Sequence, residues 1–447
     1  MKERLVTIPN KELFEVTVKV TSFGNELQNQ IKIMAEYLRL HEGAGLAANQ
    51  VGWKNRVIVV EFDDDEKHAI PFQAFINPEI VECSDDTNLL EEGCLSVPQI
   101  ELPVERALKI KLRAQNRAGK KIRLTAKGIL ARILQHEVDH LGGIIFTEHV
   151  SEKYFRDFPE LKNLKIVFFG SGEFAVPVLK GLILLGFNPL IITEKGKPAG
   201  REQKIKPTPV AELCQLFQKK VIEIEDFTRL KTNISHPDLI FLADFGQKIP
   251  EDILKKARIA ALNLHPSLLP LYRGAAPIPQ AILADEKETG VTLIEMSSKI
   301  DQGPILAQIK TEILKNDTGA ILENRLAILA LKLLYQTLPF IVRGELKKTK
   351  QDDTKASYAK KLQKTDGEIN WQDEPIKIER QIRAFSPWPG TYSYLPDGKR
   401  LIIRQAHLAG EDLVLDIVQK EGGKPIKWQE FLRGYRGQKP AWFDKIK

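Results

Sequence analysis

The segment HEVDH at residues 136–140 constrains the fold of this chain more than any other feature. It places His136 and His140 four residues apart, so on a helix the two imidazoles share one face. Glu137 lies beside them, in the arrangement in which two histidines bind one metal ion and a glutamate accepts the proton of a water molecule. The alternative is a pair of histidines exposed on a helix surface.

Apolar residues predict the helix itself. They recur at helical spacing between Ile129 and Leu141, and Gly142 follows where helices commonly end. Thr125 is the expected N-cap, because its hydroxyl could accept a hydrogen bond from the first turn.

Two upstream segments offer the other groups that a catalytic metal site needs. EEGCLS at 91–96 contains Cys94, whose thiolate is a strong ligand for iron or zinc. Two histidines and one cysteine leave a fourth coordination position open, as catalytic sites do. GAGLAANQ at 43–50 ends in Gln50, whose amide could donate to an oxyanion. Taken singly, such a cysteine is more often a buried small side chain and such a glutamine a surface amide.

In this order, the three segments resemble peptide deformylase, whose motifs have the forms GxGLAAxQ, EGCLS and HExDH. The resemblance covers residues 1–150. Asn49 takes a position at which the family more often has proline. The resemblance implies an α+β metal hydrolase that removes formate from nascent N-formyl-methionyl peptides, with the ribosome as one place of action.

The resemblance also implies the site residues of this hydrolase. The metal, Fe²⁺ or Zn²⁺, would be bound by Cys94, His136 and His140. Glu137 would act as the general base. Gln50 and the backbone N–H of Leu95 would stabilise the oxyanion.

A chain of 447 residues is too long for one such domain and predicts about three. The start, MKERLVTIPN, lacks the apolar core of a signal peptide, and no apolar run looks long enough to cross a membrane. Three cysteines, one of them expected on the metal, give no disulfide framework. We therefore expect a cytoplasmic protein with no membrane partner. Lys and Arg exceed Asp and Glu only by 66 to 59, so nucleic-acid binding must be argued from local clusters.

Residues 151–164 are expected to be a connector, because they are polar and aromatic without a clear period. A strand at 165–170, a helix and a strand at 189–193 then form a βαβ unit, which predicts an α/β domain with a doubly wound parallel sheet. The turn GSGEFA at 170–175 matches G-x-G-x-x-A, and Glu194 ends the second strand. Locally, a nicotinamide-dependent dehydrogenase is therefore an alternative.

Three polar residues point to a second reactive site. Asn263 and His265 lie in NLHPSLLPLYRGAAPI at 263–278, and Asp301 lies in KIDQGPI. They can form a trio at the carboxyl ends of neighbouring strands, where open α/β sheets place their sites. The alternatives are a hydrogen-bonded histidine in a turn and an aspartate that caps a strand end.

The segments FFGSGEFA, ADFGQKIP, SLLPLYRG, TGVT, DQGPI, YAKKL, INW and RAFSPWPGT resemble methionyl-tRNA formyltransferase. The resemblance covers about 165–447. It implies a Rossmann-like catalytic domain at 165–346, a basic linker at 347–364 and a small OB-like β-barrel at 365–447. Strand-like pieces such as RLIIRQA and LVLDIV favour that barrel.

This second resemblance implies transfer of a formyl group from 10-formyltetrahydrofolate to the amine of initiator methionyl-tRNA. His265 would move the proton, Asp301 would orient it, and Asn263 would bond the oxyanion. The folate would be bound with the help of Ser267, Leu268, Leu269 and Pro270. No separate metal is implied for this half.

Cationic groups are the evidence for a tRNA partner. The segment 195–207 is rich in Lys and Arg, and its Arg201 matches an arginine of the family's tRNA-binding loop; Lys204 and Lys206 are its expected neighbours in that role. A solvated loop is the alternative. Past Gly423, Lys and Arg alternate with aromatic residues, namely Trp428, Tyr435 and Trp442. That composition fits phosphate and base contacts, or a basic tail that packs on its own barrel.

The sequence thus predicts one chain with two enzymes of translation initiation, a deformylase and a formyltransferase. Two alternatives remain for the second half. It could formylate a sugar-nucleotide amine, which the basic loop disfavours, or it could be an inactive RNA-binding module, which the intact trio disfavours.

Overall fold

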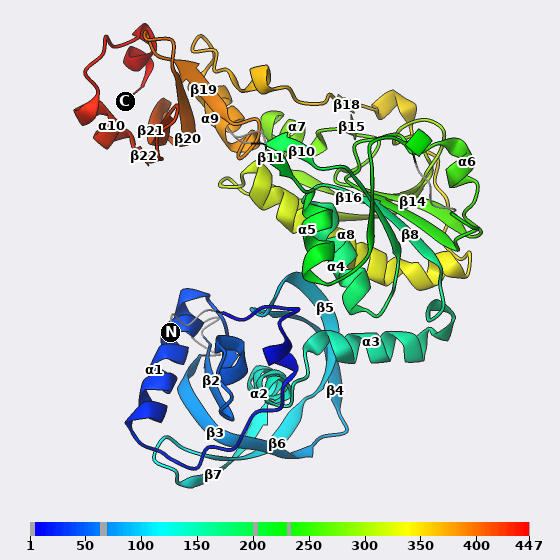
Figure 1. Ribbon diagram of the computed structural model, residues 1–447, viewed down its shortest axis with the longest axis vertical. Coiled ribbons are helices and arrows are strands. Elements are labelled where there is room, and N and C mark those ends of the chain that lie inside the picture. Colours follow the sequence, from blue (N-terminus) through cyan, green and yellow to red (C-terminus); the bar gives the residue numbers. More distant parts are fainter. Residues whose placement is uncertain (1–4, 63–68, 200–203, 230–233, 447) are drawn as a thin grey trace. The chain divides into compact units, whose positions relative to one another are not determined.

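The computed structural model describes residues 5–62, 69–199, 204–229 and 234–446. The chain forms two compact units (Figure 1). The first contains residues 1–163 with two short segments, 181–187 and 216–218, and the second contains the remainder.

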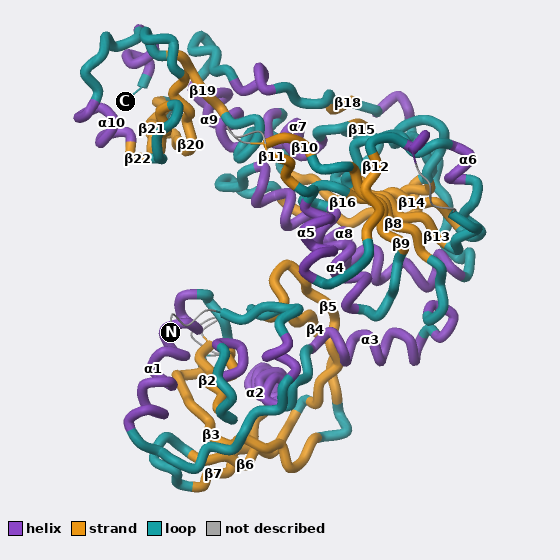
Figure 2. The backbone as a smooth tube through the Cα atoms, viewed as in Figure 1, coloured by secondary structure: helices purple, strands orange, loops and turns teal. Residues whose placement is uncertain are grey.

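The first unit is built on a five-stranded antiparallel sheet in the order β1-β2-β3-β6-β7. A hairpin, β4-β5, forms a separate two-stranded sheet. Helix α2 lies in the hollow of the curved strands (Figure 2), where its Leu134 packs with Ile58 and Leu112 in the core. The bounds are α1 Asn25–Leu40, β1 Gly45–Ala47, β2 Val57–Phe62, β3 Ile70–Cys83, β4 Thr87–Cys94, β5 Val97–Ala107, β6 Lys109–Gln115, β7 Lys121–Lys127 and α2 Gly128–Leu141.

The helix expected around HEVDH is present, but its start was wrongly predicted. Thr125 pairs with Lys111 inside β7 and caps nothing. The strand continues to Lys127, the N-cap residue, which makes no side-chain capping bond. Gly128, at φ +57°, then turns the chain directly from strand into helix. A tight strand-to-helix turn therefore replaces the capped loop.

The expected connector is partly helical, which corrects the prediction of a segment without a period. Helix α3 spans Phe146–Asp157, and a 3₁₀ turn follows at Pro159–Leu161. Phe146, Val150 and Tyr154 are all buried. They are four residues apart, so they form one apolar helix face among polar neighbours.

The second unit is centred on a seven-stranded sheet in the order β12-β9-β8-β13-β14-β16-β17. The first five strands are parallel, as expected, but β16 and β17 are antiparallel to their neighbours. The sheet is therefore mixed. The bounds are β8 Ile166–Gly170, α4 Ala175–Leu184, β9 Leu190–Glu194, α5 Pro209–Leu216, β12 Val221–Ile224, β13 Leu239–Ala243, β14 Ala260–His265, α7 Pro277–Leu283, β16 Glu288–Glu295 and β17 Ile305–Glu312.

Helix α8 (Gly319–Val342) is the main core helix of this unit. Leu322, Leu326 and Leu331 are fully buried, and the helix packs on β16 and β17. Among the described residues it is the one helix long and apolar enough to cross a membrane, and the sequence reading overlooked it. More than half of the most apolar stretch of this helix is buried inside the protein, as in core helices of soluble proteins.

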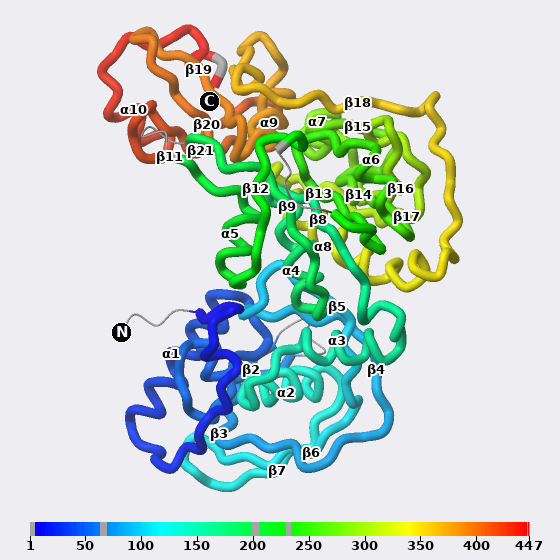
Figure 3. Tube along the Cα trace, turned by 45° about the vertical axis from the view of Figure 1, so that its right-hand side comes forward, coloured from blue at the N-terminus to red at the C-terminus, as the bar shows by residue number. Residues whose placement is uncertain are grey.

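The linker after α8 returns along the catalytic domain before the chain enters its last part. Strand β18 (Tyr358–Ala359) pairs in parallel with β15 (Arg273–Gly274), and the two lie side by side in Figures 1 and 3. The last part has a four-stranded antiparallel sheet in the order β19-β20-β21-β22. The bounds are α9 Pro375–Ala384, β19 Thr391–Tyr394, β20 Arg400–Ala409, β21 Asp412–Lys420, β22 Ile426–Lys427 and α10 Trp428–Gly434.

Aromatic residues near the C-terminus form the core of this last part. Trp428 and Trp442 are only 6% and 8% exposed. The ring of Trp442 stacks on Trp371 at 4.5 Å, and Tyr435 lies against Phe431. These side chains form the core of this last part. For the tryptophans, the interpretation of a packed tail is therefore correct, and the interpretation of base stacking is wrong.

Candidate active sites

Three side chains of the first unit bring soft and borderline donor atoms together. The sulfur of Cys94, at the end of β4, lies 3.2 Å from Nε2 of His140, which lies 3.2 Å from Nε2 of His136. One ligand atom from each residue lies within 4.8 Å of the others. The structure thus unites the three residues singled out as metal ligands, and their donor set suits iron or zinc.

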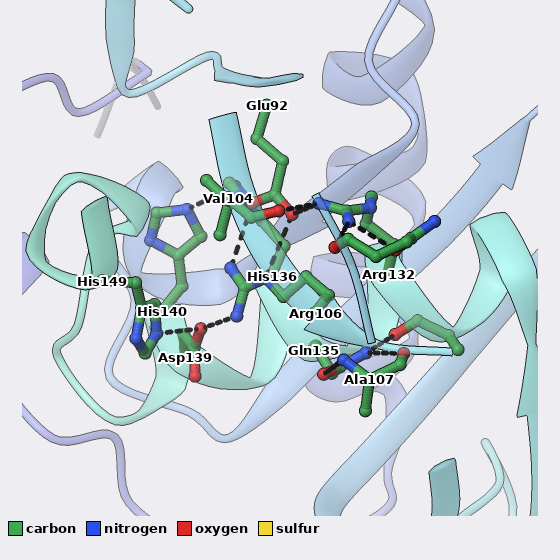
Figure 4. A network of polar contacts seen from close by, with 12 residues as sticks. Glu92, Val104, Arg106, Ala107, Arg132, Gln135, His136, Asp139, His140 and His149 are labelled. Atoms are coloured by element: carbon green, nitrogen blue, oxygen red, sulfur yellow. Dashed lines mark hydrogen bonds and ion pairs between the residues drawn. The ribbon is translucent and has the colours of Figure 1, made fainter. Parts of the chain in front are cut away.

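A buried carboxylate, Glu92, fixes the ring of His136. Its Oε2 lies 3.0 Å from Nδ1 of His136 (Figure 4). Nε2 of that ring is therefore left to face the sulfur of Cys94. Arg106 donates to both oxygens of Glu92, at 3.0 and 3.1 Å, and Arg132 donates to one at 2.5 Å. Burial would raise the pKa of Glu92, but the bonds from His136 and Arg106 outweigh it and lower the pKa to about 2.

The sequence reading missed this orienting group. Glu92 lies two residues before Cys94, inside the same motif, and a metal-bound histidine almost always donates its other ring nitrogen to an acceptor. That rule could have found it. Arg106 also bonds Asp139 at 2.5 Å, and Asp139 accepts from His149 at 2.9 Å, which ties the metal helix α2 to α3 (Figure 4).

Glu137 lies in the same pocket with an unsatisfied oxygen. It is 3% exposed, and its Oε2 has no hydrogen-bond partner among the described residues. Burial raises the pKa of Glu137 to about 7, against the opposing effect of the two imidazoles. A Cβ at Gly45 would come within 2.5 Å of Oε1, so only glycine lets β1 pass this close to the carboxylate. A carboxylate oxygen without a hydrogen-bond partner, beside three converging metal-ligand atoms, fits a site for a metal with a bound water.

The cysteine is poised as a thiolate. Burial would raise the pKa of Cys94, but the imidazoles of His140 and His136 outweigh this and lower it to about 5. The side-chain amide of Gln50 donates toward this sulfur at 3.5 Å and to Ser96 at 3.1 Å, while its oxygen accepts from the N–H of Ala47. The amide nitrogen thus faces the site. Leu95 follows Cys94 in the turn between β4 and β5.

Asn49, where proline is more common in the resembling family, has a structural task here. Its Nδ2 donates to the backbone oxygen of His140 at 2.6 Å, and the side chain is buried. Proline could not make this bond. Asn49 therefore anchors the end of helix α2, which carries His136 and His140.

The second unit brings together the polar trio expected there. Nδ2 of Asn263 donates to Oδ1 of Asp301 at 3.1 Å, and Nδ1 of His265 lies 3.7 Å from Oδ2 of Asp301. Asn263 and His265 are buried at the end of β14. Asp301 does not end a neighbouring parallel strand. It lies in the loop between the antiparallel strands β16 and β17, which folds back over β14.

The backbone carbonyl of Tyr272 orients His265. It lies 2.9 Å from Nε2, and because a carbonyl only accepts, Nε2 carries the proton. Nδ1 is then the atom that faces Asp301. At 3.7 Å, Asp301 is too far for a direct hydrogen bond to the ring, so the expected orienting role falls to Tyr272 in this structure.

The segment Ser267–Pro270 is rigidly held. The hydroxyl of Ser267 donates to the oxygen of Leu271 at 2.6 Å, and the N–H of Leu269 donates to Thr292 at 3.0 Å. Ser267 and Leu269 are buried. Their side chains shape the loop, whereas the side chains of Leu268 and Pro270 are only partly buried.

The basic segment forms a hairpin of β10 (Lys197–Ala199) and β11 (Lys204–Lys206). Arg201 lies outside the described residues. Lys204 is placed on β11, opposite Ala199. The exposed Lys206 lies 3.9 Å from Glu212. A long ion pair of this kind is worth little in water, so the ammonium group remains available to an anion.

The turn GSGEFA is stabilised by protein groups of its own. The hydroxyl of Ser171 accepts from the N–H of Glu194 at 3.0 Å and from the hydroxyl of Thr193 at 3.2 Å. A Cβ at Gly172 would clash with Oδ2 of Asp244, so the packing of this turn within the protein itself requires glycine there.

Comparisons with known proteins give one deformylase match followed by two formyl transferase matches along the chain. Residues 2–155 match the family described as polypeptide deformylase, residues 164–338 match formyl transferase, and residues 361–412 match the formyl transferase C-terminal domain. Methionyl-tRNA formyltransferase of Geobacter sulfurreducens is 33% identical over 308 residues, which are 62% of this chain and 95% of that protein. That of Enterococcus faecalis is 36% identical over 311 residues, 63% of this chain and 99% of that protein.

The chain belongs to the methionyl-tRNA formyltransferase family. Its N-terminal part adds a peptide deformylase. Among solved structures, a probable peptide deformylase from Synechococcus phage S-SSM7 is 36% identical and covers 33% of this chain and 99% of its own, with a TM-score of 0.32. The Thermotoga maritima peptide deformylase is 35% identical over 33% of this chain and 97% of its own, with a TM-score of 0.31. The family matches and the two relatives show an enzyme that joins a deformylase and a methionyl-tRNA formyltransferase in one chain.

Metal retention tests the assignment of ligands. The purified chain should hold one divalent ion, and the double variant Cys94→Ala/His136→Ala should hold none, because two of three protein ligands are gone. Elemental analysis after gel filtration measures this directly. Cys83→Ala is the matched control, since Cys83 is an exposed cysteine outside the cluster and its loss should change nothing. Full retention in the double variant would overturn the site.

Proposed function

We propose that both halves are active in the intact chain. The first half removes formate from N-formyl-methionyl peptides, and the second transfers formyl from 10-formyltetrahydrofolate to initiator methionyl-tRNA. The observation that carries this is that each unit holds a complete reactive set of its own: Cys94, His136, His140 and Glu137 in one, and Asn263, His265 and Asp301 in the other.

In the deformylase half, the side chains divide the work. Cys94, His136 and His140 would hold the metal, which when bound makes water acidic enough to attack an amide near neutral pH. Glu137 would take the proton of the attacking water and give it to the leaving amine, and its buried, unpartnered oxygen supports this role. The amide of Gln50 and the N–H of Leu95 would stabilise the oxyanion. The donor set of one thiolate and two imidazoles suits Fe²⁺ or Zn²⁺.

In the formyltransferase half, the amine of methionyl-tRNA would attack the formyl carbon of the folate. The bond from that carbon to the folate nitrogen would then break, and the released folate nitrogen would take up the proton lost by the amine. The side-chain amide of Asn263 has one N–H committed to Asp301, and its second N–H would stabilise the oxyanion. Nδ1 of His265 would receive the proton of the amine, because Nε2 is held by Tyr272. The carboxylate of Asp301 lies 3.7 Å from this nitrogen.

The partners follow from the surface chemistry. The hairpin with Arg201, Lys204 and Lys206 would contact phosphates of the acceptor stem. The four-stranded C-terminal sheet would belong to an OB-like domain that binds tRNA through its basic surface and not through the buried tryptophans. The loop Ser267–Pro270 would seat the folate. Both reactions belong to the start and processing of protein synthesis, which supports a cytoplasmic enzyme.

Two alternatives are less well supported. A sugar-nucleotide formyltransferase would not need the basic hairpin. The two relatives are methionyl-tRNA formyltransferases, and this chain matches 95% and 99% of their lengths. An inactive RNA-binding module would not need Asn263, His265 and Asp301 to remain assembled.

Two point variants of the intact chain test the proposal. Glu137→Ala should lower deformylation of a formyl-methionyl peptide about 100-fold or more, because the proton acceptor is lost, and leave formylation of methionyl-tRNA unchanged. His265→Ala should do the reverse. Both activities are measured on the same preparation, so each half serves as the folding control for the other. Loss of both activities in either single variant would contradict the proposal of two self-sufficient sites.

Salt dependence tests the role of the hairpin. Replacing Arg201, Lys204 and Lys206 by glutamine should weaken binding of methionyl-tRNA and leave the KM for the folate unchanged. Each lost phosphate contact should reduce the slope of log affinity against log salt by about 0.7–0.9. Lys315→Gln, at an exposed lysine before α8, is the control for net charge. Unchanged affinity and slope in the triple variant would favour the solvated loop.

A further inference from the structure

The linker between the catalytic domain and the C-terminal domain lies against both loops of the formyl-transfer site. Thr349 and Ile305 exchange two backbone hydrogen bonds of 2.8 Å, just after the loop that bears Asp301. Farther along, the N–H of Arg273 donates to the oxygen of Ser357 at 2.9 Å. Arg273 lies in the loop that follows His265. One linker segment therefore braces the two loops that complete the trio.

Gln351, in this linker, contacts the Asp301 loop directly. Its Nε2 donates to the backbone oxygen of Asp301 at 2.7 Å and to that of Gly303 at 2.8 Å. The residue is only 5% exposed. Both amide protons are thus committed to carbonyls of one loop, away from water, where each bond is harder to replace.

A buried arginine fixes which way this amide points. Oε1 of Gln351 accepts from Nε and Nη2 of Arg273, at 3.0 and 2.8 Å. A guanidinium only donates, so the oxygen must face it and the NH₂ group must face the loop. Arg273 is 2% exposed, and its charge is balanced by Asp353 of the same linker at 2.7 Å. All four hydrogen-bonding positions of the Gln351 amide are therefore used.

Asp301 depends on these contacts for its position. Its backbone is left-handed, at φ +54°, a conformation that a non-glycine residue holds only when its surroundings fix it. Its carboxylate accepts from Asn263 at 3.1 Å and from the N–H of Gly274 at 2.8 Å. Gln351 holds the backbone of the residue whose carboxylate faces His265.

We propose that Gln351 is a positioning residue for formyl transfer, which acts through Asp301 and is itself oriented by Arg273. The linker then supplies one positioning residue, Gln351, besides connecting the two domains. This inference rests on the proposed formyltransferase activity. Because Gln351 acts through Asp301 and not through contacts with the substrates, it controls the rate of formyl transfer and not the binding of tRNA or folate.

Gln351→Glu tests this with almost no change of shape. The carboxylate still accepts from Arg273, but it cannot donate to the carbonyls of Asp301 and Gly303 and repels them. We expect kcat for formylation to fall about 10- to 100-fold, as for a misplaced catalytic group, with the KM values for methionyl-tRNA and folate within about twofold of the parent. Asp352→Asn, the neighbouring acid–amide exchange in the opposite direction at an exposed site, should leave kcat unchanged.

A double-variant cycle separates positioning from general damage. In an Asp301→Asn background, where the carboxylate is already neutralised, Gln351→Glu should add little further loss of kcat, because both changes act through one group. Gln351→Met lacks both donors but adds no charge, and it should lower kcat in the same way. It replaces Gln351→Glu in the test if that variant folds poorly. Deformylation by the same chains and thermal unfolding report whether each variant is folded.

The outcomes are distinguishable. A parent chain that does not formylate methionyl-tRNA would remove the proposed function, and this inference with it. An active parent with unchanged kcat in folded Gln351→Glu and Gln351→Met would overturn the inference alone. Fully additive losses in the double variant, or a rise in KM with unchanged kcat, would also overturn it.

Discussion

The requirement that a buried charge be paired organises both reactive centres. In the first unit, Glu92 is 7% exposed and is held by Arg106, Arg132 and His136. Removing one partner of such a buried group costs about 3–5 kcal/mol, so the set persists as a whole. Because Glu92 is fixed, the ring of His136 is fixed, and the three donor atoms converge. In the second unit, Arg273 is likewise buried and paired, and through Gln351 it fixes the loop of Asp301.

The two centres use this device for opposed reactions on the same small group. One removes formyl from a peptide amine and the other attaches it to an aminoacyl amine, yet no residue takes part in both. Each set is complete within its own compact unit. We propose that substrate shape and charge separate the reactions: an extended peptide would reach one site, whereas a polyanionic tRNA would be drawn to the basic hairpin and C-terminal domain of the other.

Much of this could be predicted from the sequence, because the reactive residues lie in short, recognisable motifs. The residues predicted to bind a metal, the polar trio and the strands of the α/β sheet were singled out in that way, and the structure brings each set together. What was missed depends on contacts between distant segments. Thr125 looked like a cap because the strand-to-helix turn at Gly128 leaves no local signal, and the mixed composition of α3 hid an apolar face of three residues. Gln351 looked like one polar linker residue among many, and only the folded chain shows that its amide holds the Asp301 loop.

The most direct test of two separate sites is the fate of the formyl group when both substrates of the second site are supplied. The intact, metal-loaded chain is given methionyl-tRNA and a folate donor with a ¹³C-labelled formyl group, and ¹³C-formate is followed by NMR together with formyl-methionyl-tRNA. We predict that formyl-methionyl-tRNA accumulates until the acceptor is exhausted, while formate stays at the level seen with Glu137→Ala protein. Sustained formate release that disappears in the Glu137→Ala protein would contradict the account.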